Sequence, residues 1–447
     1  MESPKSFEAK TYRKVDLHLI PFLFLCYILA YIDRVNVGFA KLQMAKDLSL
    51  SDAAFATGVG LFFIGYFFFE VPSNVLLKKF GARKWIARIM ISWGIVSSLM
   101  MFAKSEWVFY GIRFMLGLAE AGFFPGIIFY LTLWYPSRLR ASRTALFASA
   151  IAFSGVIGNP VSGLIMDVLS GTLGLAGWQW LFLLEGIPSM IVGVWVFWHL
   201  DSNIGEAKWL DEKEKTLLAK NIDEEEKLKH DAKLSDAFKS GKVWVLCAIY
   251  FTLTIGLYGI TFWLPTIIDA FGVKSYLDVG LITAIPYGVA TIGMILLSFN
   301  SDRTGARRLH YFCNMAAGAL GLVFSGIFAH NPVLSVIFLS LGTLGVLESI
   351  PLFWPIPSAF LTGAAAAAGI GLVNSVGNLG GYIGPNVPVW VKYFWKDPSA
   401  SLYVIAGAVF LGALLVMTCI PKSVDAGREA PVESLGPEIE PGFQGWQ

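Results

Sequence analysis

The loop Lys78-Lys-Phe-Gly-Ala-Arg-Lys84 returns in the second half of the chain as Asp302-Arg-Thr-Gly-Ala-Arg-Arg308. The two central glycines, at 81 and 305, lie 224 residues apart, about half of the 447-residue chain. A second pair of motifs, Ile157-Gly-Asn-Pro160 and Ile383-Gly-Pro385, repeats with its glycines 226 residues apart. These landmarks share nearly one offset, so the sequence predicts two halves in parallel repeat, an arrangement found in transporters with a site between the halves.

Each half contains six apolar stretches long enough to cross a membrane, for which a helix needs about 20 residues. The runs are continuous and do not alternate every second residue, which favours helices over a β-barrel. We therefore expect an all-α polytopic membrane protein with twelve transmembrane helices in two six-helix halves. The stretches lie near residues 17–38, 53–77, 84–103, 107–134, 143–166, 178–199, 242–268, 279–300, 309–329, 333–361, 368–391 and 401–420.

The composition excludes several classes of protein. Hydrophobic residues make up 55% of the chain and charged residues only 15%, against about 25% charged in ordinary soluble domains. A soluble enzyme and a disordered chain are therefore improbable. The net charge of +2 gives no electrostatic signature for nucleic acid. Four isolated cysteines without a CxxC spacing support no metal site, and we expect no cofactor.

Lysine and arginine predict the orientation. Of 34 such residues, 26 lie in segments on one side of the predicted spans, six lie on the other side and two lie inside spans. By the positive-inside bias both termini are cytoplasmic, and we expect a multi-pass protein of the cell inner membrane. The predicted organisation is a cytoplasmic N-terminus at 1–16, a six-helix bundle at 17–199, a charged, solvated and partly helical cytoplasmic linker at 200–241, a second bundle at 242–420 and a disordered cytoplasmic tail at 421–447.

Four charged residues lie inside predicted spans. Asp33 and Arg34 are adjacent in the first, and Arg113 and Glu120 lie in the fourth. A charge at the membrane centre costs a few kcal/mol or more. Seven residues on a helix return to the same face within roughly 20°, at a rise of about 10.5 Å, so Arg113 and Glu120 are expected to line one polar cavity. An alternative reading is that these charges form internal pairs that only hold helices together.

Both signs of charge suit a proton-coupled carrier of anions. A guanidinium can bind a carboxylate through two hydrogen bonds. A carboxylate that moves between burial and the neighbourhood of a cation can take up and release a proton. At the repeat offset of 224, the four charged positions correspond to uncharged residues: Leu257, Tyr258, Ile337 and Leu344. The first half is therefore expected to carry the ionic chemistry, with Glu348 as a candidate exception in the second half.

Four further motifs identify a family resemblance. They are Tyr31-Ile-Asp-Arg-Val-Asn-Val-Gly-Phe39, Gly65-Tyr-Phe-Phe-Phe-Glu-Val-Pro-Ser-Asn74, Arg113-Phe-Met-Leu-Gly-Leu-Ala-Glu-Ala-Gly-Phe-Phe-Pro125 and Asn374-Ser-Val-Gly-Asn-Leu-Gly-Gly381. With the two basic loops, they resemble the major facilitator superfamily and, within it, the anion:cation symporter family, near the bacterial tartrate- and phthalate-type organic-acid permeases. The resemblance implies proton-coupled symport of a small organic anion, a hydroxy- or dicarboxylate or an aromatic carboxylate, by alternating access. It also implies a monomer in the lipid bilayer, with the proton as coupling ion.

The resemblance also implies roles for single residues. Carboxylates that match Asp33 and Glu120 are implicated in proton coupling, and arginines that match Arg34 and Arg113 contact or gate the substrate. Tyrosines that match Tyr31 and Tyr66 lie near it. From position alone, Tyr258 and Asn374 could line the opposite side of the pocket. Gating candidates are Glu70, near the end of the second span, and Asp302 with Arg303 in the second basic loop, where the first loop has Lys78 in place of the usual acid.

Other functions remain open at this stage. A primary pump needs a phosphate-binding G-x-x-x-x-G-K-[ST] loop, which the sequence lacks. No nucleophile or acid–base motif indicates an enzyme. The alternative that stays is a transporter-like membrane sensor that binds organic acids without moving them. The sequence does not name the anion.

Overall fold

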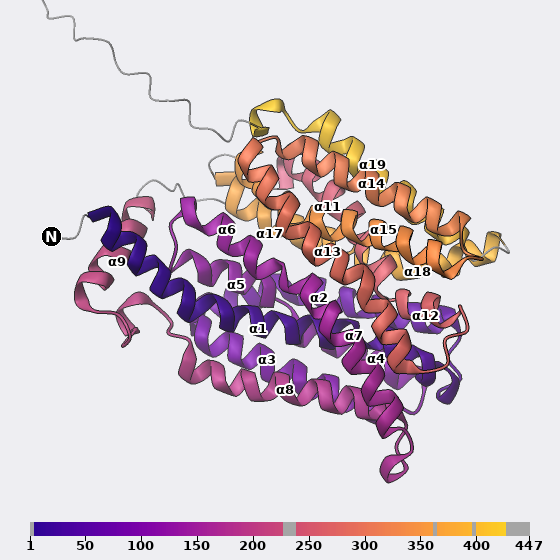
Figure 1. Ribbon diagram of the computed structural model, residues 1–447. Coiled ribbons are helices and arrows are strands. Elements are labelled where there is room, and N and C mark those ends of the chain that lie inside the picture. Colours follow the sequence, from indigo (N-terminus) through magenta and orange to yellow (C-terminus); the bar gives the residue numbers. More distant parts are fainter. Residues whose placement is uncertain (1–3, 227–237, 361–363, 396–398, 426–447) are drawn as a thin grey trace, which may run out of the picture.

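The computed structural model describes residues 4–226, 238–360, 364–395 and 399–425 (Figure 1). Within these ranges, eleven helical segments are long and apolar enough to cross a membrane. The predicted span at 368–391 is absent from the eleven because it consists of two shorter helices, α17 (Ala364–Asn378) and α18 (Gly380–Phe394). The all-α polytopic prediction is confirmed.

Two groups of helices form the molecule. The amino-terminal group contains α1 (Pro4–Asp47), α2 (Asp52–Phe80), α3 (Ala82–Leu99), α4 (Glu106–Glu120), α5 (Phe123–Thr132), α6 (Ser137–Ala148), α7 (Ala150–Leu169) and α8 (Gly177–His199). The carboxy-terminal group contains α11 (Gly241–Thr261), α12 (Leu264–Asp269), α13 (Tyr276–Thr304), α14 (Arg307–Ile327), α15 (Pro332–Phe353), α16 (Pro355–Phe360), α17, α18 and α19 (Ala400–Cys419). Figure 1 shows the first group, in indigo to magenta, below the second, in orange to yellow.

The fourth predicted span is interrupted directly after Glu120, where α4 ends. Gly122 has a φ of +85° between α4 and α5, a conformation that favours glycine over residues with a side chain. Glu120 is the last residue of α4, so the break fixes the height of its carboxylate in the bundle. Gly117, one turn earlier, lies against α2: a methyl group there would lie 2.0 Å from the carbonyl oxygen of Phe62. The backbones of α2 and α4 therefore touch.

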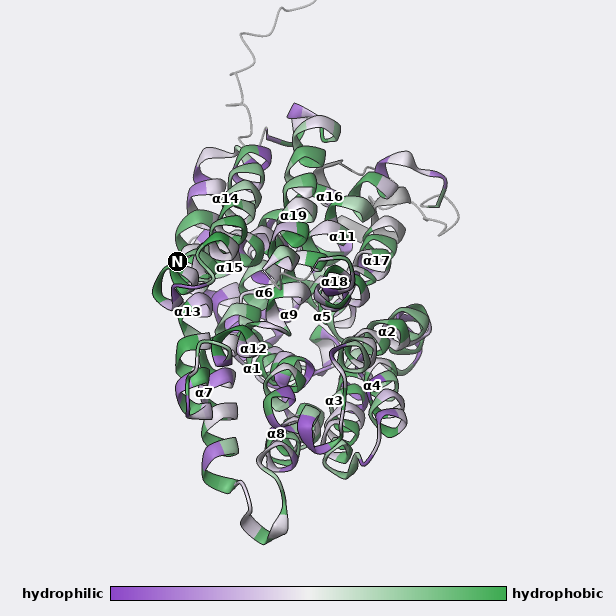
Figure 2. Cartoon of the chain, turned by 90° about the vertical axis from the view of Figure 1, so that its right-hand side faces the viewer, coloured by the Kyte–Doolittle hydropathy of each residue, from purple (hydrophilic) through white to green (hydrophobic). Residues whose placement is uncertain are grey.

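The two groups meet along α7 with α13 and along α2 with α18. Figure 2 looks at the molecule from the end where α12 lies and shows these helix pairs beside each other, with the colour of hydrophobic residues along much of the helices in both groups. Small residues allow the contact, as in other membrane interfaces. A methyl group on Gly163 of α7 would lie 2.3 Å from the carbonyl oxygen of Tyr276, and one on Gly280 of α13 would lie 2.3 Å from that of Asn159.

The linker between the groups contains a helix that docks on the start of α1. Helix α9 (Glu212–Glu226) lies beside the start of α1 (Figure 1). Lys14 Nζ lies 2.7 Å from Glu214 Oε2, and Asn221 Nδ2 donates to the Tyr12 hydroxyl at 3.1 Å. We call this end of the bundle the linker end and the opposite end, where α1 finishes, the far end.

Described residues near both ends of the chain are helical beyond the limits of the predicted spans. Helix α1 begins at Pro4, so the residues predicted as a separate N-terminal segment continue into the first span without interruption. The prediction of disorder from 421 onward is wrong at its start, because Lys422–Asp425 form a 3-10 helix. Asp425 accepts a hydrogen bond of 2.9 Å from the backbone of Arg308. Residues 426–447 lie outside the described residues.

Candidate functional site

Arg34 joins the two helix groups at the middle of the molecule. On one side it donates its Nε, at 3.0 Å, and its Nη2 to the carboxylate of Glu120 on α4. On the other side its Nη1 donates to the hydroxyl of Tyr258 on α11 at 2.8 Å. All three residues are buried. The sequence placed Arg34, Glu120 and Tyr258 in one site, and the structure brings them into direct contact.

Aromatic rings surround this pair. The guanidinium carbon of Arg34 lies 5.8 Å from the ring centre of Tyr31, 5.7 Å from that of Tyr66 and 5.5 Å from that of Phe62. Such distances allow cation–π attraction. Phe62 also lies 5.1 Å from the guanidinium carbon of Arg113. The two tyrosines named from the sequence therefore sit at the site. Phe62 was missed, although it lies four residues before Tyr66 and so shares its helix face.

Arg113 is a buried cation that makes no side-chain hydrogen bond to the described residues. Its side chain is 0% exposed, and none of its three guanidinium nitrogens has a hydrogen-bond partner among the described residues. Glu120 was expected to share a cavity with Arg113, yet its carboxylate is bound by Arg34. A buried charge that is neither paired nor hydrogen-bonded is costly. An arginine in this position is suited to a ligand that supplies negative charge.

Asp33 faces away from this centre. Its carboxylate accepts hydrogen bonds from Trp93 Nε1 at 3.0 Å, Ser97 Oγ at 2.8 Å and Ser189 Oγ at 2.5 Å. These donors belong to α3 and α8, so Asp33 is held inside the amino-terminal group. The neighbouring Arg34 turns the other way, as expected for residues about 100° apart on a helix. The role of Asp33 in proton coupling stays a prediction.

Glu70 joins the groups on the linker-end side of the centre. Its two carboxylate oxygens accept hydrogen bonds from Asn374 Nδ2 and, at 2.8 Å, from Ser375 Oγ, both on α17. The sequence assigned Asn374 to the substrate pocket and Glu70 to gating, and the structure places the two in contact. Phe124 and Trp354 also meet across the groups here, with ring centres 5.7 Å apart.

Charged residues close the far end. Asp52 on α2 bridges Lys41 of its own group, at 3.0 Å, and Lys392 of the other, at 3.1 Å. The Nζ of Lys41 also lies 3.7 Å from the ring centre of Trp263, in the carboxy-terminal group. These residues thus link the two groups through one carboxylate and one cation–π contact.

Asp167 adds a second far-end contact. This residue, near the end of α7, accepts hydrogen bonds from Ser275 Oγ at 2.7 Å and from the backbone nitrogens of Tyr276, at 3.1 Å, and Leu277, at 2.8 Å. A carboxylate from one group therefore caps α13 of the other, where the helix dipole favours negative charge. The far-end residues were not recognised in the sequence, because they lie at span ends where charges are ordinary.

Three remaining candidates stand apart from the centre. Arg303 is exposed at the linker end, and the side chain of Asp302 lies outside the described part of the structure, so their gating role stays a prediction. Glu348, on α15, is fully buried, and its Oε1 accepts a hydrogen bond of 3.0 Å from Ser298.

The contacts on both sides of Arg34 describe a closed arrangement. Glu70 links the groups toward the linker end, while Asp52 and Asp167 link them toward the far end. Between these contacts lie the Arg34–Glu120 pair and the unpartnered Arg113.

Comparison with known proteins agrees with this architecture. The sequence model described as "Major Facilitator Superfamily" matches residues 23–385. A "Putative tartrate transporter" of Agrobacterium vitis is 44% identical over 431 residues, which cover 95% of this chain and 98% of the relative. The "Inner membrane transport protein RhmT" of Escherichia coli strain K12 is 38% identical over 407 residues, covering 91% and 94%.

Solved structures share the fold at low sequence identity. A D-xylose-proton symporter superposes with a TM-score of 0.71 at 15% identity, covering 93% of this chain and 99% of the other. The xylose transporter XylE of E. coli, in a partially occluded inward open conformation, gives a TM-score of 0.69 at 14% identity, covering 91% and 98%. At these identities the likeness concerns the arrangement of helices only.

Proposed function

The chain belongs to the major facilitator superfamily and is a multi-pass membrane transporter, and from this premise we propose that it carries a small organic anion together with protons. In this proposal the anion binds between the two helix groups, and the protein is a member of the organic-acid permeases of the anion:cation symporter family. Orientation by the positive-inside bias places both termini and the linker end in the cytoplasm, and the far end outside the cell inner membrane.

The unpartnered Arg113 carries the proposal. Its guanidinium is fully buried with no hydrogen-bond acceptor among the described residues. A guanidinium binds a carboxylate through two parallel hydrogen bonds. An organic anion would therefore supply the acceptors that the described residues do not provide for Arg113. The rings of Phe62 and, beside Arg34, Tyr31 and Tyr66 give such a ligand an apolar surface.

The proton enters through the Arg34–Glu120 pair. When the Glu120 carboxylate takes up a proton, it loses its charge and weakens its hold on Arg34. The freed guanidinium can then bind a second carboxylate of the same substrate. The empty carrier returns only after Glu120 gives up its proton and binds Arg34 again. This exchange of partners couples the uptake of one proton by Glu120 to the binding of one anion by Arg34. Because Arg34 would bind a second carboxylate, the site favours dicarboxylates.

Alternating access would use the contacts at the two ends. Breaking the Asp52–Lys392 and Asp167–Ser275 contacts opens the site to the outside, and breaking the Glu70–Asn374 contact opens it to the cytoplasm. Two relatives bear the name of a tartrate transporter, so tartrate is the first substrate to test, followed by other hydroxy- and dicarboxylates and aromatic carboxylates.

Uptake by proteoliposomes tests the proposal. Purified protein would be screened for thermal stabilisation by organic acids, and the best ligand, radiolabelled, would be offered to proteoliposomes. Accumulation should increase when the outer pH is lowered, and a protonophore should abolish it. Equilibration without accumulation would overturn proton coupling. Binding without entry would support the alternative of a sensor.

A further inference from the structure

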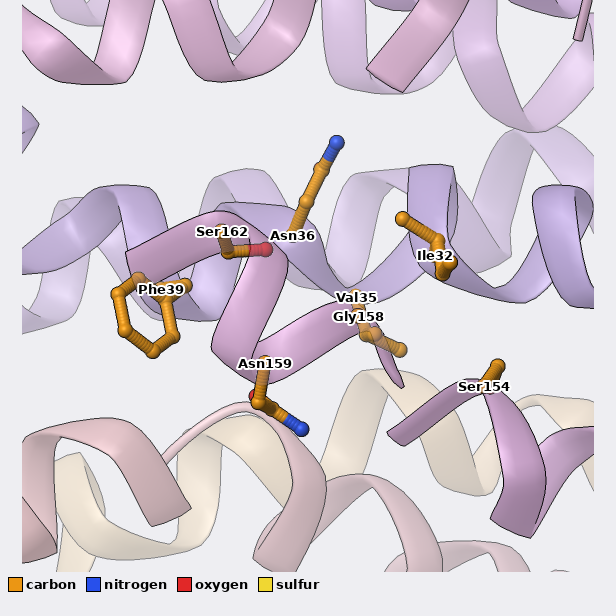
Figure 3. A pocket seen from close by; sticks show the side chains of 8 residues that line it. All are labelled: Ile32, Val35, Asn36, Phe39, Ser154, Gly158, Asn159 and Ser162. Carbon is orange, nitrogen blue, oxygen red and sulfur yellow. The ribbon is translucent and has the colours of Figure 1, made fainter. Parts of the chain in front are cut away.

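A small pocket with both apolar and polar lining residues lies in the amino-terminal group, apart from the proposed anion site. Asn36 of α1 and Ser162 and Asn159 of α7 line the pocket (Figure 3). The space has a volume of about 10 Å³, which is enough for about one water molecule. It is too small for an organic anion.

A buried carboxylate borders the pocket. Glu185 on α8 is 6% exposed, and its Oε1 accepts a hydrogen bond of 2.7 Å from the Ser162 hydroxyl. Its other oxygen, Oε2, has no hydrogen-bond partner in the described residues. Asn36, which is 2% exposed, also has neither its Oδ1 nor its Nδ2 bonded within the described part of the chain. The Asn36 side chain lies close enough to Glu185 to influence its carboxylate.

Asp33 and Glu185 lie about one helical turn apart along the contact between α1 and α8. Asp33 and Asn36 are three residues apart on α1, and Glu185 and Ser189 are four apart on α8, so each pair shares a helix face. Ser189 donates to Asp33 Oδ2, which places Asn36 opposite Glu185 one turn further along. Among the described residues, no lysine, arginine or histidine lies within ion-pair distance of either carboxylate.

The other charged groups of the surrounding helices are engaged elsewhere. Asp33 is the charged residue that interacts electrostatically with Glu185. On α1, Arg34 binds Glu120 and Lys41 binds Asp52. On α7, Asp167 caps α13. On α3, Arg88 lies over the ring of Trp85, with 4.5 Å between the guanidinium carbon and the ring centre. None of these cations reaches the pocket.

Physical chemistry limits what can neutralise this carboxylate. Buried charges in proteins are paired, protonated or bound to a cation. Glu185, which is bonded to the pocket-lining Ser162, supplies one carboxylate oxygen, and Asn36 and Ser162 of the lining supply one amide oxygen and one hydroxyl. These groups are ligands for hard cations. A divalent ion such as Ca²⁺ takes six to eight oxygens, usually with several carboxylates. One free carboxylate oxygen and room for one water fit a single positive charge.

We propose that the Asn36–Ser162–Glu185 pocket binds one monovalent cation, either Na⁺ or a proton, at a site separate from the Arg34–Glu120 pair. As Na⁺, the cation contacts Glu185 Oε2, Asn36 Oδ1 and the Ser162 hydroxyl. As a proton, it bonds to Glu185 Oε2 and donates to Asn36 Oδ1. In both forms one charge is added at α1 and α8, next to Asp33.

Binding of the cation can be measured without transport, so the test is independent of the proposed function. The thermal unfolding midpoint of the purified full-length protein would be recorded as Na⁺ replaces choline at constant ionic strength, and again as pH is varied without Na⁺. The variants are Glu185→Gln and Asn36→Leu. Glu106→Gln, which removes an exposed carboxylate outside the pocket, is the matched control.

The two arms distinguish the cations. If Na⁺ binds, it raises the wild-type midpoint by roughly 2 °C or more at saturation, and both pocket variants lose this shift while Glu106→Gln keeps it. If a proton binds, Na⁺ has no effect, and the gain in stability as pH falls is smaller in Glu185→Gln than in wild type. A Glu185→Gln protein that responds to Na⁺ and pH like wild type overturns the proposal.

A second variant tests the proposal even if Glu185→Gln does not fold. Asn36→Asp leaves Glu185 in place and adds a second carboxylate to the pocket, so the midpoint should respond more strongly to the cation than in wild type. An unchanged response in Asn36→Asp overturns the proposal even when Glu185→Gln cannot be purified.

Discussion

Arg34 donates two of its nitrogens to the same carboxylate oxygen of Glu120. The remaining terminal nitrogen reaches across to Tyr258 in the other helix group. The guanidinium is thus shared between a group that can change its charge and a group that moves with the opposite half. A change of protonation at Glu120 therefore acts directly on a contact between the halves.

Replacement of Glu120 by glutamine should separate binding from driven transport. Glutamine resembles the protonated carboxyl and cannot release a proton. We expect Glu120→Gln to bind the anion as well as wild type or up to about tenfold more tightly, because a negative charge near the ligand is gone. Accumulation driven by a pH gradient should vanish, while counterflow exchange should survive, since it needs no net proton release.

Paired uptake and counterflow in proteoliposomes would check this expectation, with Glu106→Gln as a control for loss of an exposed carboxylate. Full accumulation by Glu120→Gln would remove Glu120 from the coupling mechanism and leave Asp33 as the predicted proton site. Loss of counterflow together with accumulation would mean that the substitution damages the site itself.

Arg113 should lower the stability of the ligand-free protein and strengthen its binding of the anion. Because the side chain is buried without a partner, Arg113→Met is expected to raise the free energy of unfolding without ligand, by about 1–4 kcal/mol. The same variant should weaken anion binding by about 100-fold or more, since it removes two hydrogen bonds to a charged group, each worth about 1.5–3 kcal/mol. Arg113→Lys keeps the charge but loses the planar fork, so it should also bind weakly.

Thermal unfolding with and without the anion measures both effects in one experiment. If Arg113→Met were less stable than wild type in the absence of ligand, the arginine would contribute to the fold. Wild-type affinity in Arg113→Lys would reduce its role to a point charge.

The far-end contacts should set the balance between open and closed forms. Asp167→Asn weakens the cap on α13 without changing the size of the side chain. Spin labels on Lys46→Cys and Lys274→Cys, both exposed near the far end, would report the distance between groups in a protein whose own cysteines are replaced by serine. We expect a larger population at long distances.

Asp278→Asn is the matched control. This exposed carboxylate also lies in the first turn of α13, but it is part of the carboxy-terminal group and so makes no link between the two groups. It should leave the distance distribution of wild type unchanged. An equal change in both variants would assign the effect to the helix dipole and not to the contact between groups.

Two glycines on α4 test the packing of α2 against α4. A methyl group at Gly117 would lie 2.0 Å from the carbonyl oxygen of Phe62, whereas one at Gly111 meets nothing within 4 Å in the described residues. Gly117→Ala should destabilise the protein by about 1–3 kcal/mol or more. Gly111→Ala should be neutral or stabilising by up to about 1 kcal/mol. Thermal unfolding compares the two, and equal midpoints would contradict the close approach of these helices.

The sequence predicts the spans and the charged centre well, for a physical reason. Long apolar runs are required to cross a bilayer, and charges inside it are costly. Both features can therefore be recognised in a single sequence. Tyr258, named from its position as a residue of the opposite side, does contact Arg34. The resemblance added Tyr31 and Tyr66, which lie against Arg34.

The choice of partners could not be predicted in the same way. Glu120 binds Arg34 on another helix, and Arg113, on its own helix, stays unpaired. Asn374 meets Glu70 across the two groups. Such pairings depend on the angles and heights at which helices pack, which follow from contacts such as Gly117 against Phe62 and not from spacing along one helix.

The backbone contacts at Gly163 and Gly280 have a kinetic consequence. At these two places the main chains touch through glycine, so the contact residues have no side chain that must change rotamer when α7 and α13 move past each other. These two points then add little to the activation barrier for reorientation of the groups. That barrier falls on the polar contacts at the two ends and on side-chain contacts such as the Tyr287 ring against Gly155. A larger residue at either glycine would add friction there and slow turnover, even where the affinity for the anion stayed the same.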